Sequence, residues 1–241
     1  MDPNAKANMQ ALRDNPYPGR GIVIGQTPDA RHYVQVYWIM GRSENSRNRV
    51  FVCEGDTVRT APYDPSRAKD PSLIIYNCAR VVDRCHIVSN GNQTDTVFGA
   101  LRAEGTFEEA LFECRAEPDV PNYTARIAGL VDLDDRHHVY KLSIVKLHRH
   151  DPDHCVRQVF CYEAGMPGLG HCIHTYAGDG NPLPYFEGEP YVVALPNDLD
   201  KTAELFWGIL NAENKISVMA KFIDAESGQS EVRIINKHGG T

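Results

Sequence analysis

Several features that would place a chain in a class at once are missing from this sequence. No stretch of its 241 residues approaches the roughly 18 consecutive apolar residues that a membrane-spanning helix needs. The polar beginning MDPNAKANMQ has no charged-then-apolar layout of a signal peptide. We therefore expect a cytoplasmic protein that does not act at a membrane.

A basic excess is missing as well. The formal net charge is -7, and the isoelectric point is near 5.8. Proteins that bind nucleic acid in general carry a positive surface that displaces counterions from the phosphates. The composition therefore excludes a general nucleic-acid binder, and any site for an anion must be local.

The sequence has no C-x-x-C pair, and its seven cysteines are scattered. Structural zinc normally needs closer ligand spacing, so reduced and mostly buried thiols are expected. The stretch HRHDPDHC, with His148, His150, His154 and Cys155, is the one place that suggests a metal. Its Asp-Pro-Asp centre is more typical of a hairpin turn, and we predict neither a metal nor a cofactor.

Common catalytic signatures are also absent. The sequence contains no G-x-G-x-x-G, no phosphate-binding P-loop and no G-x-S-x-G. Asp2 follows the initiator methionine, where an N-terminal nucleophile would be Ser, Thr or Cys.

What the chain does contain is strands. Without a repeat or a Gly/Ser linker, residues 1–241 are predicted to form one domain. Strand-like runs occupy residues 20–27, 32–40, 50–55, 72–78, 85–90, 125–133, 139–148 and 156–164. Helical periodicity marks 94–117, capped by Thr94 or Thr96 and broken at Gly105 and Thr106, and 197–211, capped by Asn197 or Asp198. This order favours an α+β fold of antiparallel sheets covered by helices.

Polar clusters follow several of these strands. The segment GRSENSRNR holds Arg42, Ser43, Arg47 and Arg49, and guanidinium groups match phosphate or carboxylate oxygens in pairs. The segment is either an anion site or a solvated loop.

For each of the other polar clusters, a structural role is an alternative to a role in a binding site. Tyr76 and Asn77 end an apolar run, and Asn90 belongs to an Asn-Gly pair that is ordinarily a tight turn. The stretch EPDVPNYTARIAG is either a site or a loop that re-enters the sheet. Residues 168–190, rich in Gly, Pro, His and aromatics, form a long irregular segment of a kind that often carries function.

Taken in order, YPGRGIVIG, GRSENSRNR, LIIYNCARVV, IVSNGNQTD and PNYTARIAG resemble the archaeal-type inosine monophosphate (IMP) cyclohydrolase family and its bacterial relatives. The resemblance covers residues 17–130 and extends to GEPYVV near residue 193. It implies a four-layer αββα sandwich similar to the N-terminal-nucleophile hydrolases, without their nucleophile. It also implies closure of the second purine ring of a formamidoimidazole-carboxamide ribonucleotide to give IMP in purine biosynthesis.

The resemblance further implies roles for individual residues. Arg47, Tyr76 and Glu117 match positions expected to be catalytic, with Asp119 as the alternative carboxylate, and Arg49 is assigned no role. Arg47 would stabilise negative charge, Tyr76 would donate to the formyl oxygen or relay a proton, and the carboxylate would polarise the amide. The expected contacts to a purine ribonucleotide are Arg20, Arg42, Ser43, Asn77, Asn90, Asn122, Arg126 and His174.

Two other functions remain open, an amidohydrolase acting on a nucleotide-like cyclic amide and a non-catalytic nucleotide-binding protein. The sequence is longer than the compact archaeal pattern, and neither HRHDPDHC nor residues 168–190 has a counterpart there. His174 and Asp179 would therefore line the same pocket or build a contact between subunits. Phe206, Trp207 and Leu210 are core or subunit contact, which leaves a homo-oligomer open.

Overall fold

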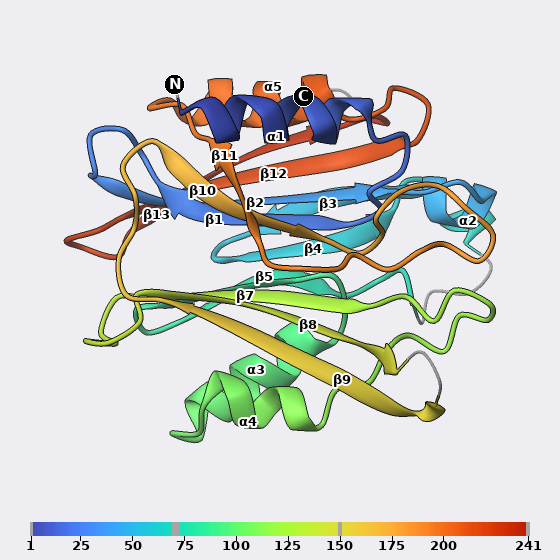
Figure 1. The fold of residues 1–241 in the computed structure, drawn as a ribbon, viewed down its shortest axis with the longest axis horizontal. Coiled ribbons are helices and arrows are strands. Elements are labelled where there is room, and N and C mark those ends of the chain that lie inside the picture. Colours follow the sequence, from blue (N-terminus) through green and yellow to red (C-terminus); the bar gives the residue numbers. More distant parts are fainter. Residues whose placement is uncertain (1, 69–72, 149–150, 240–241) are drawn as a thin grey trace.

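The computed structural model describes residues 2–68, 73–148 and 151–239. Its centre is two stacked antiparallel sheets (Figure 1). The first has six strands in the order β11-β10-β1-β2-β12-β13. Their bounds are β1 Gly21–Gln26, β2 His32–Met40, β10 Leu169–His174, β11 Tyr191–Ala194, β12 Lys215–Asp224 and β13 Ser230–Asn236.

The second sheet has seven strands in plain sequence order, β3 to β9. Their bounds are β3 Arg49–Glu54, β4 Thr57–Pro62, β5 Asn77–Val82, β6 Cys85–Ser89, β7 Arg126–Asp132, β8 Tyr140–His148 and β9 Asp151–Tyr162. Consecutive strands are antiparallel neighbours, and the two long connections are the one between β4 and β5, which holds a 3-10 turn, and the one between β6 and β7, which holds two helices. Sequence neighbours therefore become spatial neighbours, as in a meander.

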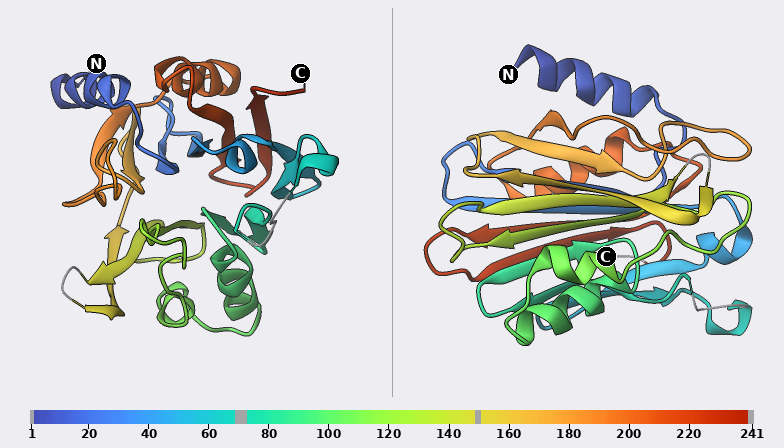
Figure 2. Two further views of the ribbon diagram at one scale, coloured as in Figure 1. Left: turned by 90° about the vertical axis from the view of Figure 1, so that its right-hand side faces the viewer. Right: turned by 60° about the horizontal axis from the view of Figure 1, so that its bottom comes forward.

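Helices cover the outer faces of both sheets (Figure 2). Helix α1 (Pro3–Asp14) packs on β11, and α5 (Leu199–Ile209) packs on β12 and β13. Helices α3 (Gln93–Arg102) and α4 (Phe107–Phe112) lie on the other side, where α3 contacts β5 and β6. The short α2 (Glu44–Arg47) and a 3-10 turn (Pro65–Arg67) lie in connections. The α+β prediction with two stacked antiparallel sheets is confirmed.

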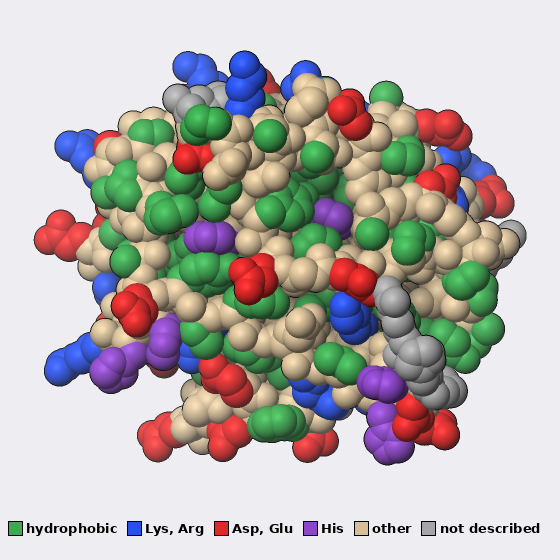
Figure 3. Space-filling model, in the orientation of Figure 1, with side chains coloured by type: hydrophobic (Ala, Val, Ile, Leu, Met, Phe, Trp, Pro, Cys, Tyr) green, Lys and Arg blue, Asp and Glu red, His purple; other side chains and the backbone are tan. Residues whose placement is uncertain are grey.

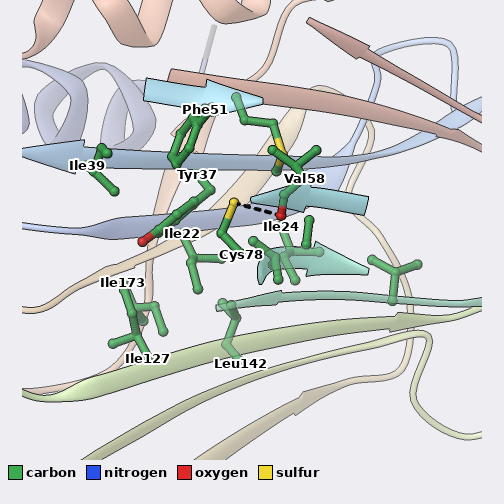
Figure 4. Close-up of a cluster of buried hydrophobic side chains, with 14 of the residues drawn as sticks. Ile22, Ile24, Tyr37, Ile39, Phe51, Val58, Cys78, Ile127, Leu142 and Ile173 are labelled. Carbon is green, nitrogen blue, oxygen red and sulfur yellow. Dashed lines mark hydrogen bonds between the residues drawn. The ribbon is translucent and has the colours of Figure 1, made fainter. Parts of the chain in front are cut away.

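The main hydrophobic core fills the space between the sheets (Figure 4). Ile22, Ile24 and Ile39 point into it from the first sheet, and Ile127 and Leu142 from the second. Alternate residues of β2, such as Val36 and Trp38, face the helices instead. This alternation is the period of two that a strand imposes. Because both faces of the first sheet are covered, β1 and β2 read as nearly continuous apolar runs.

The strand predictions for β1, β2, β3, β6, β7, β8 and β9 are confirmed. The apolar run 72–78 is a correction, because β5 begins only at Asn77 and the residues described before it form a turn and an irregular stretch. A second correction concerns residues 169–174, which were expected to be irregular. They form β10 and pair with β1 along its length. Only residues 175–190 of that predicted segment are largely irregular.

The helix pair and its break are confirmed, but the first cap is not. Asn92 precedes α3, and Thr94 lies inside the helix, hydrogen-bonded to Ser89. Thr106 caps α4 with a reciprocal bond from Glu109, and Asp198 caps α5 as predicted. Helix α1 was not predicted because its residues are mostly polar, with only Ala5 and Leu12 buried.

The hairpin between β8 and β9 is confirmed, but its turn is not the Asp-Pro-Asp centre. Asp151 already belongs to β9 and pairs with His148, while His150 lies outside the described residues. All seven cysteines are free, and three of them are buried. Phe206 and Leu210 belong to the core under α5, where Phe206 stacks on Trp38. None of the helices described is long and apolar enough to cross a membrane.

Candidate functional site

A cavity of about 380 Å³ opens at one end of the two sheets, beside α2. In Figure 1 the loop after β10 and the loop before β7 reach this same end. The cavity walls therefore come from segments far apart in the sequence. Its lining comprises Tyr17, Arg20, Arg42, Ser43, Asn45, Ser46, Arg49, Leu73, Ile74, Glu117, Asp119, Asn122, Tyr176 and Leu183.

A buried carboxylate lies among the cations of the cavity. Arg20 Nη2 donates to both Glu117 oxygens at 2.9 Å, and Arg126 Nη1 donates to Oε1 at 3.1 Å. Burial raises the pKa of Glu117, and the guanidinium groups of Arg20 and Arg126 offset part of that rise. Burial opposes the charge of Arg20, but Glu117 and the neighbouring tyrosines raise the pKa of Arg20 above its ordinary value. The two partners thus stabilise each other's charge.

Arg49 is the other buried cation of the cavity, with 1% of its surface exposed. Its Nε donates to the Ser46 carbonyl at 2.7 Å and its Nη2 to the Ser46 hydroxyl at 2.8 Å. Among the described residues it has no carboxylate partner, and its Nη1 has no hydrogen-bond partner. Burial lowers the pKa of Arg49 from its ordinary value. An unpaired buried guanidinium favours an anionic or strongly accepting ligand.

The rim of the cavity is more exposed. The Arg42 side chain is 41% exposed, lies over the Tyr17 ring at 4.8 Å and pairs with Asp179. Ser43 begins α2, and its hydroxyl accepts from Ser46 N. On the other wall Asn122 accepts from Leu183 N at 3.1 Å. The irregular segment 175–190 therefore contributes to the cavity at Tyr176 and Leu183 and, through Asp179, to its rim.

A chain of hydroxyl groups joins the cavity wall to an acid. The Tyr176 hydroxyl is hydrogen-bonded to Thr124 Oγ1. Thr124 Oγ1 donates to Asp119 Oδ2 at 2.5 Å, and Thr124 N donates to Asp119 Oδ1 at 2.6 Å. The Tyr176 ring stacks on Tyr17, with 5.9 Å between ring centres. Packing and hydrogen bonds thus hold Tyr176 in one orientation.

Tyr76 lies deeper and does not line the cavity. Its hydroxyl is hydrogen-bonded to the Tyr37 hydroxyl at 2.7 Å, and both side chains are buried. Burial raises the pKa of Tyr76, and the charges of Arg49 and Arg20 oppose that rise. Tyr76 is therefore close to the buried cations but bonded to the opposite sheet.

Four predicted site residues lie away from this cavity. Arg47 donates to the Gly41 carbonyl and to Asn214, and lines a different pocket with Tyr63. This placement corrects the expectation that Arg47 shares a site with Glu117. It arises because α2 divides neighbouring residues between two pockets.

The other three residues are held by protein partners. Asn77 donates to Asp95, and Asn90 bonds Ala125, Ile127 and Gln93 at the edge between β6 and β7. His174 Nδ1 is bonded to the Tyr176 carbonyl, and burial lowers the pKa of His174 to about 4. These polar side chains form hydrogen bonds at strand ends and in loops. Sequence alone does not distinguish such a residue from one that contacts a ligand.

Sequence reasoning missed Arg49, Tyr176 and Tyr17. For Arg49 the available signal was its place as the first residue of an apolar strand, which predicts burial. Tyr176 belongs to the segment 168–190 that the sequence marked as functional, but it was given no site role of its own. Tyr17 carried no signal, because only the pairing of β1 with β10 brings the two tyrosines together.

No group of three metal-binding side chains occurs within the described part of the chain. His154 instead bonds Asp151 at 2.6 Å. On the face shown in Figure 3, basic and acidic side chains of the described residues are interspersed. The concentration of arginine in the cavity is therefore a local feature.

The fold and cavity define a class, a two-sheet α+β protein with an arginine-lined cavity at one end of the sheets. Residues 17–228 match the family described as IMP cyclohydrolase-like protein, and the chain belongs to that family. The resemblance found in the sequence motifs is confirmed.

Relatives named IMP cyclohydrolase come from methanogens. The Methanopyrus kandleri protein is 34% identical over 120 residues, which are 48% of this chain and 59% of that protein. The Methanococcus aeolicus protein is 32% identical over 95 residues, 39% of this chain and 46% of that protein. The Methanocaldococcus jannaschii protein is 28% identical over 120 residues, 49% of this chain and 58% of that protein. The matched region thus spans about half the length of these relatives.

Proposed function

We propose that this protein is an IMP cyclohydrolase. It would close the second ring of 5-formamidoimidazole-4-carboxamide ribonucleotide and release water to give IMP. Family membership and the printed activity of the relatives support this function. The observation that carries it is Arg49, a buried guanidinium that lines the cavity and has no carboxylate partner among the described residues.

Binding divides between the rim and the floor of the cavity. Arg42 and Ser43 at the exposed rim suit the 5′-phosphate, which can keep part of its hydration there. Arg49 and Arg20 lie deeper, where their donors can meet the carboxamide and formyl oxygens. Hydrogen bonds from buried cations are stronger in such a water-poor site.

The reaction itself needs positioning more than new bonds to the protein. The carboxamide nitrogen attacks the formyl carbon of the same molecule, so holding the two groups in contact removes most of the entropic barrier. Charge develops on the former formyl oxygen, and we assign Arg20 and Arg49 to stabilise it. No step of this chemistry calls for a metal or a cofactor.

Glu117 receives a different role from the one that the sequence suggested. Its oxygens accept from Arg20 and Arg126, so the carboxylate is occupied by protein donors. We assign it to orient Arg20 toward the substrate, and not to polarise the amide directly. Tyr76 is hydrogen-bonded to Tyr37 behind the cavity, and we assign it the same indirect role of holding neighbouring residues in place.

We extend the proposal to the fold and setting. The order of helices and stacked sheets supports a four-layer sandwich similar to the N-terminal-nucleophile hydrolases, with residues 1–241 acting as one domain. A purine ribonucleotide would be the partner, and the cytoplasm the place where such an intermediate is made.

The test is to mix the purified protein with the formylated ribonucleotide and to follow the absorbance of the purine product. Ring closure, abolished when Arg49 is replaced by methionine of similar length, is the expected result. Saturable binding without turnover would leave a nucleotide-binding protein. Hydrolysis of a cyclic amide without ring closure would indicate the amidohydrolase.

A further inference from the structure

We propose that Tyr176, Thr124 and Asp119 form the proton relay of the ring closure, with Tyr176 as the residue that exchanges a proton with the substrate. This inference rests on the proposed function. It assigns a reacting hydroxyl to the segment after β10, which the sequence comparison with the compact archaeal pattern left without a role.

The hydrogen bonds of the chain have one direction. The carboxylate of Asp119 can only accept, so the single hydroxyl proton of Thr124 is donated to Oδ2. The bond between Thr124 Oγ1 and the Tyr176 hydroxyl must then be donated by Tyr176. The lone pairs of the Tyr176 oxygen are consequently available to accept a proton. The chain therefore runs from Tyr176 toward the acid.

Both end residues of this hydrogen-bond relay line the cavity. Tyr176 and Asp119 line it, whereas Thr124 is fully buried between them. Arg20, paired with Glu117, lies close enough to Tyr176 to oppose the effect of burial on the tyrosine. Burial raises the pKa of Tyr176, so at neutral pH the phenol keeps a proton and can pass it along the chain without becoming a stable anion.

Tyr76 lacks these properties. Its hydroxyl is bonded to Tyr37, whose own hydroxyl is buried, and neither tyrosine lines the cavity. The Tyr37 and Tyr76 pair ends in no carboxylate among the hydrogen bonds of the described residues. A proton that entered at Tyr76 would have no acceptor at the far end.

The relay balances the protons of the reaction. As the carboxamide nitrogen bonds to the formyl carbon, its proton passes to Tyr176, that of Tyr176 to Thr124, and that of Thr124 to Asp119. The carbonyl π bond breaks, and the formyl oxygen becomes an alkoxide that receives this same proton when the relay runs in reverse, which gives a hydroxyl group. In the second step the proton of the former formamido nitrogen enters the relay, and the relay returns a proton to the hydroxyl group. The carbon–oxygen bond then breaks and water leaves, while that nitrogen and the former formyl carbon form their double bond. No proton is gained or lost overall.

Three single variants and one double variant test the relay in the cyclisation assay. Thr124→Val keeps the side-chain shape but removes the hydroxyl, and Tyr176→Phe keeps the ring stack on Tyr17. Each should lower kcat about 100-fold, in the range general acid–base catalysis contributes, with KM changed little. Thr124→Ser should recover most of the kcat. The double variant should lose no more than either single one, because both break one chain.

A solvent isotope effect on kcat gives a readout that a structural role would not move. The wild type should be slower in D₂O, with more than one proton contributing, and Thr124→Val should lose this multiple-proton dependence. If the wild type turns over and Thr124→Val matches Thr124→Ser, the relay is wrong while the function stands. If the folded wild type binds the ribonucleotide without converting it, the proposed function is wrong and the relay with it.

Discussion

Arg47 and Arg49 are two residues apart, yet they line different cavities. Arg47 ties α2 to the loop before β12 by donating to Asn214, whereas Arg49 lines the cavity of the candidate site and has a buried Nη1 without a hydrogen-bond partner among the described residues. The proposed function therefore gives the two arginines different roles, Arg47 holding α2 in place and Arg49 binding the substrate.

Replacing Arg49 by lysine should lower kcat/KM about 100-fold, because an ammonium cannot both bond Ser46 and present a planar fork to the substrate. Arg47→Lys is the matched control and should change kcat/KM less than threefold. Both are measured by cyclisation kinetics on protein whose folding has been checked by circular dichroism. Equal losses in the two variants would contradict the assignment.

Tyr76→Phe should act on stability more than on chemistry. Losing the bond to Tyr37 leaves a buried hydroxyl without its partner, at a cost of about 1 kcal/mol in the free energy of unfolding. We expect kcat to fall less than tenfold, against the far larger loss for Tyr176→Phe. Urea unfolding and turnover of the same preparation decide the matter, and a loss of activity equal to that of Tyr176→Phe would return the proton role to Tyr76.

At the scale of elements, helix α4 depends on its cap. Thr106 accepts from Glu109 N, and Glu109 accepts from Thr106 N, so two end donors are satisfied reciprocally. Thr106→Ala should cost about 1 kcal/mol of unfolding free energy. Thr96→Ala, at an exposed position inside α3, is the control and should cost nothing measurable by denaturant titration. Comparable losses at both positions would show that the cap is not the cause.

Strand periodicity predicted most of the second sheet because its hairpins are local. It failed for residues 73–76, whose apolar side chains Leu73 and Ile74 line a cavity rather than a strand. It failed also for β10, whose Gly and His residues are poor strand formers in isolation. There the pairing with β1 overrides local preference.

At the scale of the whole molecule, three histidines of the described residues, His86, His171 and His174, are largely buried, and burial disfavours their charged form. Burial lowers the pKa to about 3 in His86 and to about 4 in His171 and His174. Because these values lie below the unfolded value, the unfolded state binds more protons between pH 6.5 and 4. Stability should then be full above about pH 6.5 and be lost as the pH falls.

At pH 5, His174 alone should account for about 2 kcal/mol of the loss relative to pH 7.5. Urea titrations at the two pH values measure it, and His174→Gln should reduce the loss by about 2 kcal/mol, leaving the part due to His86 and His171. A free energy of unfolding that is level between pH 7.5 and pH 5 would show that these rings charge freely in the folded protein.

The candidate site was predictable in part. Arg20, Arg42, Ser43, Glu117 and Asn122 came from motifs and do line the cavity, with Arg126 bonded to Glu117 behind them. Tyr176 also lines the cavity, but no motif gave it a site role, because its position depends on a stacking partner more than 150 residues away in the chain. Asn90 and Asn77, also expected to contact the substrate, are hydrogen-bonded to backbone and side-chain groups of the protein.

The polar contacts at this end of the sheets also bridge them. Arg20 and Tyr176 adjoin strands of the first sheet, and their partners Glu117 and Thr124 precede a strand of the second. The groups proposed to bind the substrate are thus also groups that form hydrogen bonds between the two sheets. A change that frees Arg20 or Tyr176 to bind the substrate more tightly would weaken the contact between the sheets, and a change that strengthens this contact would weaken substrate binding.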